Sequence, residues 1–268
     1  VELGQFDPVV NTAVDISEQE TALGRVALAK RLLVFHAEVA ASPIRGCFDD
    51  KTNPLVSLKD ALTSQASSLA DFMYTCKLWL QETPTKEAIK NVPNLSDDGA
   101  MSIWMYTAES PLYTNLNDAL RALDRNALKR SYFPYLRLLL TALNAVRDAS
   151  KSKKPRMVNR GVPLDLNARY PDKYKVDKLL VWWGISSCTT DIGVLKDDTF
   201  LGVTGERTIF QIQTSCSIDV SPFSAIKAEK EVVLPPGFAL KITGMLPMAD
   251  GLTIFTCEDD DDAPELVT

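Results

Sequence analysis

The sequence predicts an α+β protein in which a helical N-terminal half is followed by a β-rich C-terminal half. Apolar residues recur at steps of three and four up to about residue 149. Beyond residue 156, short runs rich in β-branched and aromatic residues alternate with Gly, Pro and Asp. The chain has 268 residues, of which 46% are hydrophobic, so it is long enough to bury a substantial core. The Lys- and Ser-rich stretch 150–156 is expected to be a solvated linker between the halves.

Helices account for the first half. The first expected helix spans 18–41, opens with the capping box Ser17-x-x-Glu20 and places its apolar residues along one stripe. Each further segment has apolar residues at helical spacing, with proline or a capping residue near its ends. The further helices are expected at 54–84, from 95–97 onward, at 114–125 and at 133–149.

Strands account for the second half. Each predicted run is short, apolar and bounded by Gly, Pro or Asp. The acidic residues that close the chain lack such a pattern, and 259–268 is expected to be a frayed acidic tail. The runs that predict strands are 178–186, 207–220, 230–243 and 251–258.

Composition excludes several function classes. A net charge of −6 disfavours binding to nucleic acid or to an anionic membrane surface, and the apolar runs are too short to span a bilayer. The five cysteines are scattered without a Cys-x-x-Cys pair, and the single histidine, His36, falls within the first expected helix. A metal site and a histidine-based triad are therefore not expected. The chain is expected to be soluble, and either secreted or cytoplasmic, and it has neither a dinucleotide-binding glycine motif nor a P-loop.

The remaining candidates for chemistry lie on three segments of the β-rich half. They are Arg160, then Ser187 with Thr189, then Glu229 with Glu231. In an extended chain, residues i and i+2 point to the same side, so each pair can face one site. Taken singly, each has a structural explanation: a charged strand edge for the glutamates, a surface ion pair for the arginine and a polar strand face for the hydroxyls. Spacing alone favours the strand edge for the glutamates.

Together these segments resemble the R-S-E class of mono-ADP-ribosyltransferases, which includes ecto-enzymes and arginine-modifying toxins. Arg160-Gly161-Val162 resembles the Arg motif, Ser187-Cys188-Thr189 the Ser-Thr-Ser motif and Glu229-Lys230-Glu231 the Glu-x-Glu loop. The resemblance extends from about residue 95 to residue 258. Its helical landmarks are Tyr106-Thr107, Leu112-Tyr113, Leu116-Asn117 and Leu120-Arg121.

The resemblance implies an ADP-ribosyltransferase fold, with helices packed on a mixed two-sheet β core, and the use of NAD⁺ as a substrate without a metal. It implies that Glu231 stabilises an oxocarbenium-like transition state as the bond to nicotinamide breaks. It further implies that Arg160 holds the NAD phosphates, that Gly161 lets the backbone approach the nicotinamide, that Ser187 orients Glu231, and that Thr189 supports the strand.

The first glutamate of the motif sets the acceptor in this family, so Glu229 implies modification of an accessible arginine on a protein substrate. An NAD glycohydrolase and a non-catalytic NAD-binding or interaction module remain alternatives. The resemblance places the catalytic domain at 94–258, a helical extension of unassigned role at 1–93 and the acidic tail at 259–268. Some positions depart from the family pattern: Asn159, Ile185, Cys188, Ile226 and Lys227.

Overall fold

The computed structural model describes residues 43–108, 110–150, 154–197, 201–227, 230–260 and 266–268. The helix expected at 18–41, with His36, lies outside the described residues, and so does Glu229. The helices of the first half are α3 (Leu58–Ala61), α4 (Ala70–Leu80), α5 (Thr83–Lys90), α6 (Asp97–Thr107), α7 (Pro111–Arg121), α8 (Asn126–Ser131) and α9 (Phe133–Ala149).

The segment 54–84, expected as one helix, is divided in the structure. It forms α3, a 3₁₀ turn at Thr63–Gln65 and α4, and the chain then turns into α5. The sequence interpretation ended this pattern near Pro84, but Pro84 lies in the first turn of α5. Because the first N–H groups of a helix have no intrahelical partner, a proline there costs nothing and can begin a helix as well as end one.

The helices expected further along the chain are confirmed. Ser96 caps α6 by accepting a hydrogen bond from the Gly99 backbone N–H at 3.0 Å. Pro134 lies in the first turn of α9, the longest helix of the described residues. The short helix α8 was not predicted, because six residues carry too little periodicity to be recognised.

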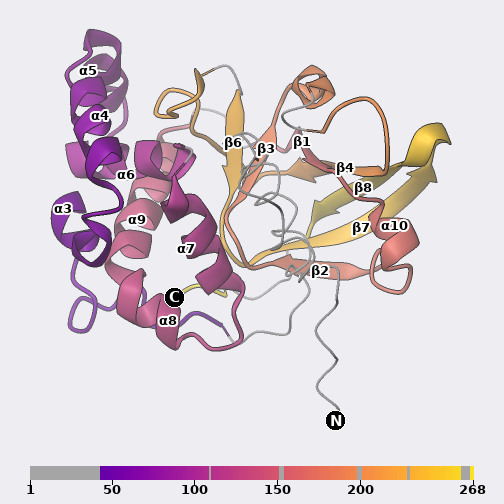
Figure 1. Cartoon of the computed structure of the whole chain (residues 1–268), viewed down its shortest axis with the longest axis horizontal. Coiled ribbons are helices and arrows are strands. Elements are labelled where there is room, and N and C mark those ends of the chain that lie inside the picture. Colours follow the sequence, from indigo (N-terminus) through magenta and orange to yellow (C-terminus); the bar gives the residue numbers. More distant parts are fainter. Residues whose placement is uncertain (1–42, 109, 151–153, 198–200, 228–229, 261–265) are drawn as a thin grey trace.

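The described residues of the second half form eight strands. The strands are β1 (Arg156–Val162), β2 (Leu179–Trp182), β3 (Ser186–Thr189), β4 (Arg207–Thr214), β5 (Ile218–Asp219), β6 (Glu231–Leu234), β7 (Phe238–Pro247) and β8 (Leu252–Asp259), with the short helix α10 (Leu166–Arg169) after β1. Their order is β2-β7-β8-β4-β1-β3-β6-β5, and the β4–β8 pair is parallel while the other pairs are antiparallel. Figure 1 shows α3 to α9 gathered on one side of the molecule and the strands on the other.

The β core is one hydrogen-bonded sheet, whereas the resemblance implied two. The connection between its halves is narrow, because β1 and β3 pair at a single position, Asn159 with Thr189. The sheet also curls on itself: Trp182 of β2 packs edge-on against Phe210 of β4, although β7 and β8 separate these strands in the sheet order. A curled sheet with one narrow junction therefore provides two facing β layers without a break in the strand order.

Two large apolar clusters cover the two faces of the sheet. In one, α3 to α9 pack together and against Val233 of β6 and Ile185 before β3. In the other, Val232 and Leu234 of β6 meet Phe210 and residues of β7 and β8. Successive residues of β6 thus alternate between the clusters, as strand geometry requires. Helices α3 to α5 share their cluster with α6 to α9, and the domain boundary at residue 93 stays a prediction.

The last described residues lie against the start of the described chain. Ile44 and Val267 form a parallel bridge, and Leu266 packs over the turn between β6 and β7. Gly237 in that turn has a φ of 76°, and a Cβ there would approach the Cβ of Leu266 to 2.9 Å. A side chain at position 237 would therefore be strained by both the backbone and the contact.

All five cysteines are free thiols. Burial raises the pKa of Cys47, Cys76 and Cys257 to about 12 in each case, so these thiols stay protonated and unreactive at neutral pH. The described part of the chain contains no helix with the length and apolarity needed to cross a membrane.

Candidate functional site

Two adjacent strands, β3 and β6, bring Ser187, Thr189 and Glu231 to one face of the sheet. Glu231 at the start of β6 pairs directly with Thr189 of β3, and Thr189 pairs with Asn159 of β1. Directly paired residues project from the same face, and Ser187, two residues before Thr189, projects there too. The structure therefore aligns the side chains of the Ser motif and the second glutamate, as the sequence predicts.

Glu231 is a buried carboxylate, with 5% of its surface exposed. The Ser224 hydroxyl donates to its Oε2 at 3.4 Å, and the Ser221 hydroxyl and the Val220 backbone N–H donate to its backbone carbonyl at 3.2 Å each. These contacts fix the residue at the point where the loop joins β6. Ser224, 1% exposed, was not among the residues identified from sequence, because an isolated serine has no recognisable spacing.

Lys230 breaks the strand alternation on which the Glu-x-Glu argument relied. Its φ is 46°, in the left-handed region, so the backbone is not extended between positions 229 and 231. Strand alternation therefore does not relate the side chains of Glu229 and Glu231, since alternation holds only in an extended chain, and their facing one site stays a prediction. The position of Glu229 itself lies outside the described residues.

Arg160 belongs to the opposite face of β1. Its neighbours Val158 and Val162, which share that face, lie in the apolar cluster around Phe210. The guanidinium, in a residue only 3% exposed, donates from Nη1 to the Ser187 backbone carbonyl at 2.6 Å and lies over the Trp182 ring at 5.6 Å. Arg160 therefore supports β3, the strand that carries Ser187, across the narrow junction of the sheet.

Gly161 lies on the same face as Asn159, beneath the segment that follows β3. A Cβ at position 161 would lie 3.1 Å from the Cβ of Leu201 and 3.3 Å from the Cδ2 of Leu195. Leu195 belongs to the 3₁₀ helix η2 (Ile192–Lys196), and both leucines pack with Ile209 in a small cluster. The absence of a side chain at Gly161 therefore lets η2 approach the strand closely.

A buried polar network links α6 and α7 to the start of β3. The Tyr106 hydroxyl donates to the Ile185 carbonyl at 2.9 Å and accepts from Asn117 Nδ2 at 2.9 Å. Burial raises the pKa of Tyr106 well above its usual value; the charge of Glu231 raises it further, while that of Arg160 lowers it. Tyr106 is thus within electrostatic reach of both residues that the sequence singled out.

Arg121, at the end of α7, is a second buried guanidinium near this network. It is 2% exposed, and its Nη2 donates to Asp118 Oδ1 at 2.6 Å, while Nε and Nη1 have no hydrogen-bond partner. Burial lowers the pKa of Arg121, and Asp118, Tyr113 and Tyr106 raise it. A guanidinium with two unpaired N–H groups is suited to an anionic ligand. The sequence marked Leu120-Arg121 only as a landmark, and that landmark is the signal that could have identified this residue.

Asn159 is a third residue, after Ser224 and Arg121, that the sequence did not assign to the site. It is 4% exposed, its Nδ2 makes a long contact of 3.4 Å to the Thr189 carbonyl, and its Oδ1 has no partner. It pairs with Gln211 on β4, so the polar row Glu231, Thr189, Asn159 continues across the sheet. A buried amide oxygen without a partner is a candidate contact for a ligand. In the described ranges, no three His, Cys, Asp or Glu side chains are grouped so as to hold a metal ion.

The chain superposes on several solved structures that are named as ADP-ribosyltransferases. The chain superposes on HopU1 of Pseudomonas syringae pv. Tomato DC3000 with a TM-score of 0.57 and 18% identity, over 86% of this chain and 96% of that one. The eukaryotic mono-ADP-ribosyltransferase ART2.2 gives a TM-score of 0.54 and 14% identity, over 85% and 95%. Vis, an ADP-ribosyltransferase from Vibrio splendidus, in complex with agmatine gives 0.51 and 18%, over 76% and 91%. A search of curated proteins finds no match.

The curled mixed sheet covered by helices is therefore the ADP-ribosyltransferase fold, as the sequence predicts. The profile of the NAD:arginine ADP-ribosyltransferase family matches residues 41–261, and the chain belongs to this family. The activity of this class is NAD-dependent ADP-ribosyl transfer.

Proposed function

We propose that the chain transfers ADP-ribose from NAD to arginine side chains of a protein substrate. The observation that carries this proposal is the buried Glu231 carboxylate, paired with Thr189 and on the same face as Ser187. A carboxylate removed from water and held by its backbone acts strongly on positive charge that develops beside it. Cleavage of a glycosidic bond to ribose develops such charge at the ribose carbon.

Each supporting residue acts on this carboxylate or on its strand. Ser187 is half-buried on the face of Glu231, where its hydroxyl would orient the carboxylate and the ribose. Ser224 donates to Oε2 from the other side. Arg160 supports β3 through the Ser187 carbonyl, and its charge lowers the pKa of Tyr106. Thr189 keeps the direct pairing of β3 with Glu231.

The residues present fit a dinucleotide bearing two phosphates. Arg121 would bind a phosphate oxygen with its unpaired Nε and Nη1 groups, which supplies a cation within a chain of net charge −6. The unpaired Asn159 oxygen would accept a hydrogen bond from a hydroxyl or amide of the same ligand. In this proposal Arg160, which the resemblance assigned to the phosphates, acts chiefly by holding β3.

The arginine acceptor is proposed from Glu229 together with one relative. A carboxylate matches a guanidinium in both charge and geometry, and Glu229 precedes Glu231 by two residues. The Vis structure contains agmatine, a small guanidine. In this proposal the acceptor arginine binds beside the Glu231 carboxylate, at the loop that contains Glu229 and precedes β6.

The test of the proposed acceptor is a comparison of wild type with Glu229→Gln in the presence of NAD and agmatine. We expect the wild type to form ADP-ribosyl-agmatine, and the variant to lose about 10²-fold or more of this transfer. Release of free ADP-ribose is expected to persist in the variant, because Glu231 is intact. Mass spectrometry of both products measures the ratio.

Two outcomes would contradict the proposal. Free ADP-ribose as the only product of the wild type would indicate an NAD glycohydrolase, and no consumption of NAD would indicate a binding module. The matched control is Glu258→Gln, an exposed glutamate near the end of β8. This variant should give both products at the wild-type ratio.

Arg121→Met is expected to raise the KM for NAD by about 10- to 100-fold, because a charge-assisted hydrogen bond contributes about 1.5–3 kcal/mol. Steady-state kinetics with agmatine measures the change, and thermal unfolding shows whether the variant is folded. Arg121→Lys should recover only part of the affinity, since it keeps the charge but lacks the planar fork. The control is Arg147→Met, a half-exposed arginine on α9. An unchanged KM in folded Arg121→Met would remove this residue from the NAD site.

A further inference from the structure

An ion pair joins two segments that border the Glu231 carboxylate. Lys230 Nζ lies 2.9 Å from Asp191 Oδ2. Lys230 immediately precedes Glu231, at the end of the loop that would receive the acceptor. Asp191 immediately precedes η2, the segment whose Leu195 packs over Gly161. The ion pair thus connects the acceptor side of the site with the segment that covers β1.

Asp191 is held by more than this ion pair. Its Oδ1 accepts the Gly193 backbone N–H at 2.9 Å, which caps η2, and its own N–H donates to Thr189 Oγ1 at 3.1 Å. The hydrogen bond from Lys230, then that from Gly193 and the charge of Lys230, lower the pKa of Asp191, which is therefore ionised at neutral pH. Asp191 therefore links three parts of the chain: its carboxylate binds η2 and Lys230, and its backbone N–H binds β3.

Lys230 has a backbone conformation that residues other than glycine rarely adopt. A φ of 46° is unfavourable for a lysine relative to the extended or helical regions, and such residues persist only where their surroundings hold them. Lys230 is held on one side by the pairing of β6 with β3, which begins at Glu231, and on the other by Asp191. The strained residue lies between the two glutamates of the motif.

We propose that Lys230 and Asp191 are positioning residues that hold η2 against Gly161 and so keep the wall of the NAD site in place. The inference rests on the proposed function for its kinetic readout. Neither side chain contacts the reacting atoms. Because the ion pair is half-exposed, it stabilises the packing of η2 against Gly161 only modestly. Its effect therefore falls on the binding of NAD rather than on cleavage of the bond to nicotinamide.

The first experiment is steady-state kinetics of Lys230→Met and Asp191→Asn at low and high salt. Asparagine at position 191 can still accept the Gly193 N–H, so Asp191→Asn removes the charge and keeps the cap. We expect each variant to raise the KM for NAD about two- to five-fold, with kcat within about two-fold of wild type. The ratio of variant to wild-type KM should approach one at about 0.5 M salt, because salt screens an exposed ion pair.

The double variant and the conservative variant Lys230→Arg distinguish a positioning role of the ion pair from a general loss of structure. The double variant Lys230→Met/Asp191→Asn should be no worse than either single variant, and Lys230→Arg should retain the wild-type KM. The matched control is Lys241→Met, which breaks an exposed ion pair between β7 and Asp177, at 3.4 Å. It should leave the KM for NAD unchanged.

The second experiment does not depend on activity. Amide hydrogen exchange of residues 191–196 should be faster in Lys230→Met than in wild type, and unchanged in Lys241→Met. Equal exchange together with an unchanged KM would overturn the inference, as would additive effects in the double variant. If the wild type leaves NAD intact, the proposed function fails, and the exchange measurement still decides whether Lys230 holds η2.

Discussion

Glu231→Gln is expected to abolish both ADP-ribosyl transfer and release of free ADP-ribose, with a loss of about 10²- to 10³-fold or more in kcat. Glutamine has almost the same shape as glutamate but carries no charge, so it cannot stabilise positive charge at the ribose carbon. The buried setting of Glu231 makes this loss large, since a charge acts more strongly where water is excluded. Product analysis with NAD and agmatine measures both reactions.

Comparison of Glu231→Gln with Glu229→Gln shows which step each glutamate serves. Loss of both products at position 231, with loss of transfer alone at position 229, separates cleavage from acceptor choice. Thermal unfolding should show that Glu231→Gln is folded, because an amide of the same size still accepts from Ser224. A Glu231→Gln variant that cleaves NAD at the wild-type rate would show that another group stabilises the transition state.

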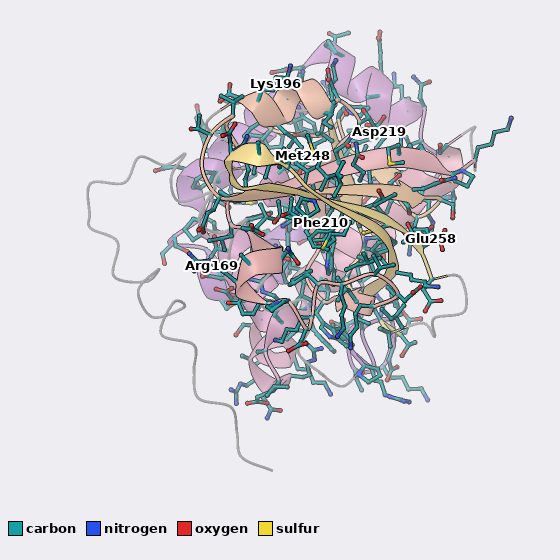
Figure 2. The ribbon with its side chains drawn as sticks, turned by 90° about the vertical axis from the view of Figure 1, so that its right-hand side faces the viewer. Arg169, Lys196, Phe210, Asp219, Met248 and Glu258 are labelled. Carbon is teal, nitrogen blue, oxygen red and sulfur yellow. The ribbon has the colours of Figure 1, made fainter. Side chains whose placement is uncertain are left out.

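Phe210→Ala is expected to lower the free energy of unfolding by about 3–5 kcal/mol, the cost of removing a large buried aromatic side chain. Phe210 is fully buried, stacks on Phe255 at 5.3 Å and meets Trp182 edge-on at 5.3 Å. Figure 2 shows it in the interior, with Lys196 and Glu258 toward the periphery. It joins strands that the curl of the sheet brings together, so its loss affects both β layers. Urea unfolding measures the change.

The same substitution should also affect the site. Phe210 pairs directly with Arg160, whose guanidinium lies over the Trp182 ring that Phe210 supports. The control is Phe48→Ala, at an exposed position, where a loss of at most about 1 kcal/mol is expected. If Phe210→Ala does not fold, Phe210→Leu should give a smaller, measurable loss in the same direction. A loss below about 1 kcal/mol for Phe210→Ala would show that the curled sheet does not depend on this cluster.

Strand alternation holds for the Ser motif but does not relate the two glutamates. It correctly set Ser187 and Thr189 on one face, because β3 is extended and paired with β6. It does not apply between Glu229 and Glu231, because Lys230 has a positive φ that no spacing rule reveals. A left-handed lysine depends on its surroundings rather than on its own preference.

The position of Pro84 likewise did not reveal from sequence where one helix ends and the next begins. Pro84 can end one helix or begin the next, and only the packing of α4 and α5 against the other helices decided between them. The sequence therefore predicted that this region is helical, but not where the helices divide. Element boundaries depend on tertiary contacts in this way because the energy differences between neighbouring endpoints are small.

By itself, the sequence determined that a helical half precedes a β-rich half, and hence the α+β class, since periodicity is a local property. The Arg, Ser and Glu motifs were identified from the family resemblance, whereas β1, which carries Arg160, was not among the predicted strands. Only the tertiary structure decided which side each motif faces. It turned Arg160 toward Trp182, buried groups of Arg121 and Asn159 without hydrogen-bond partners, and joined Lys230 to Asp191. These arrangements depend on how a curled sheet brings together residues that are distant in the chain, which no local pattern encodes.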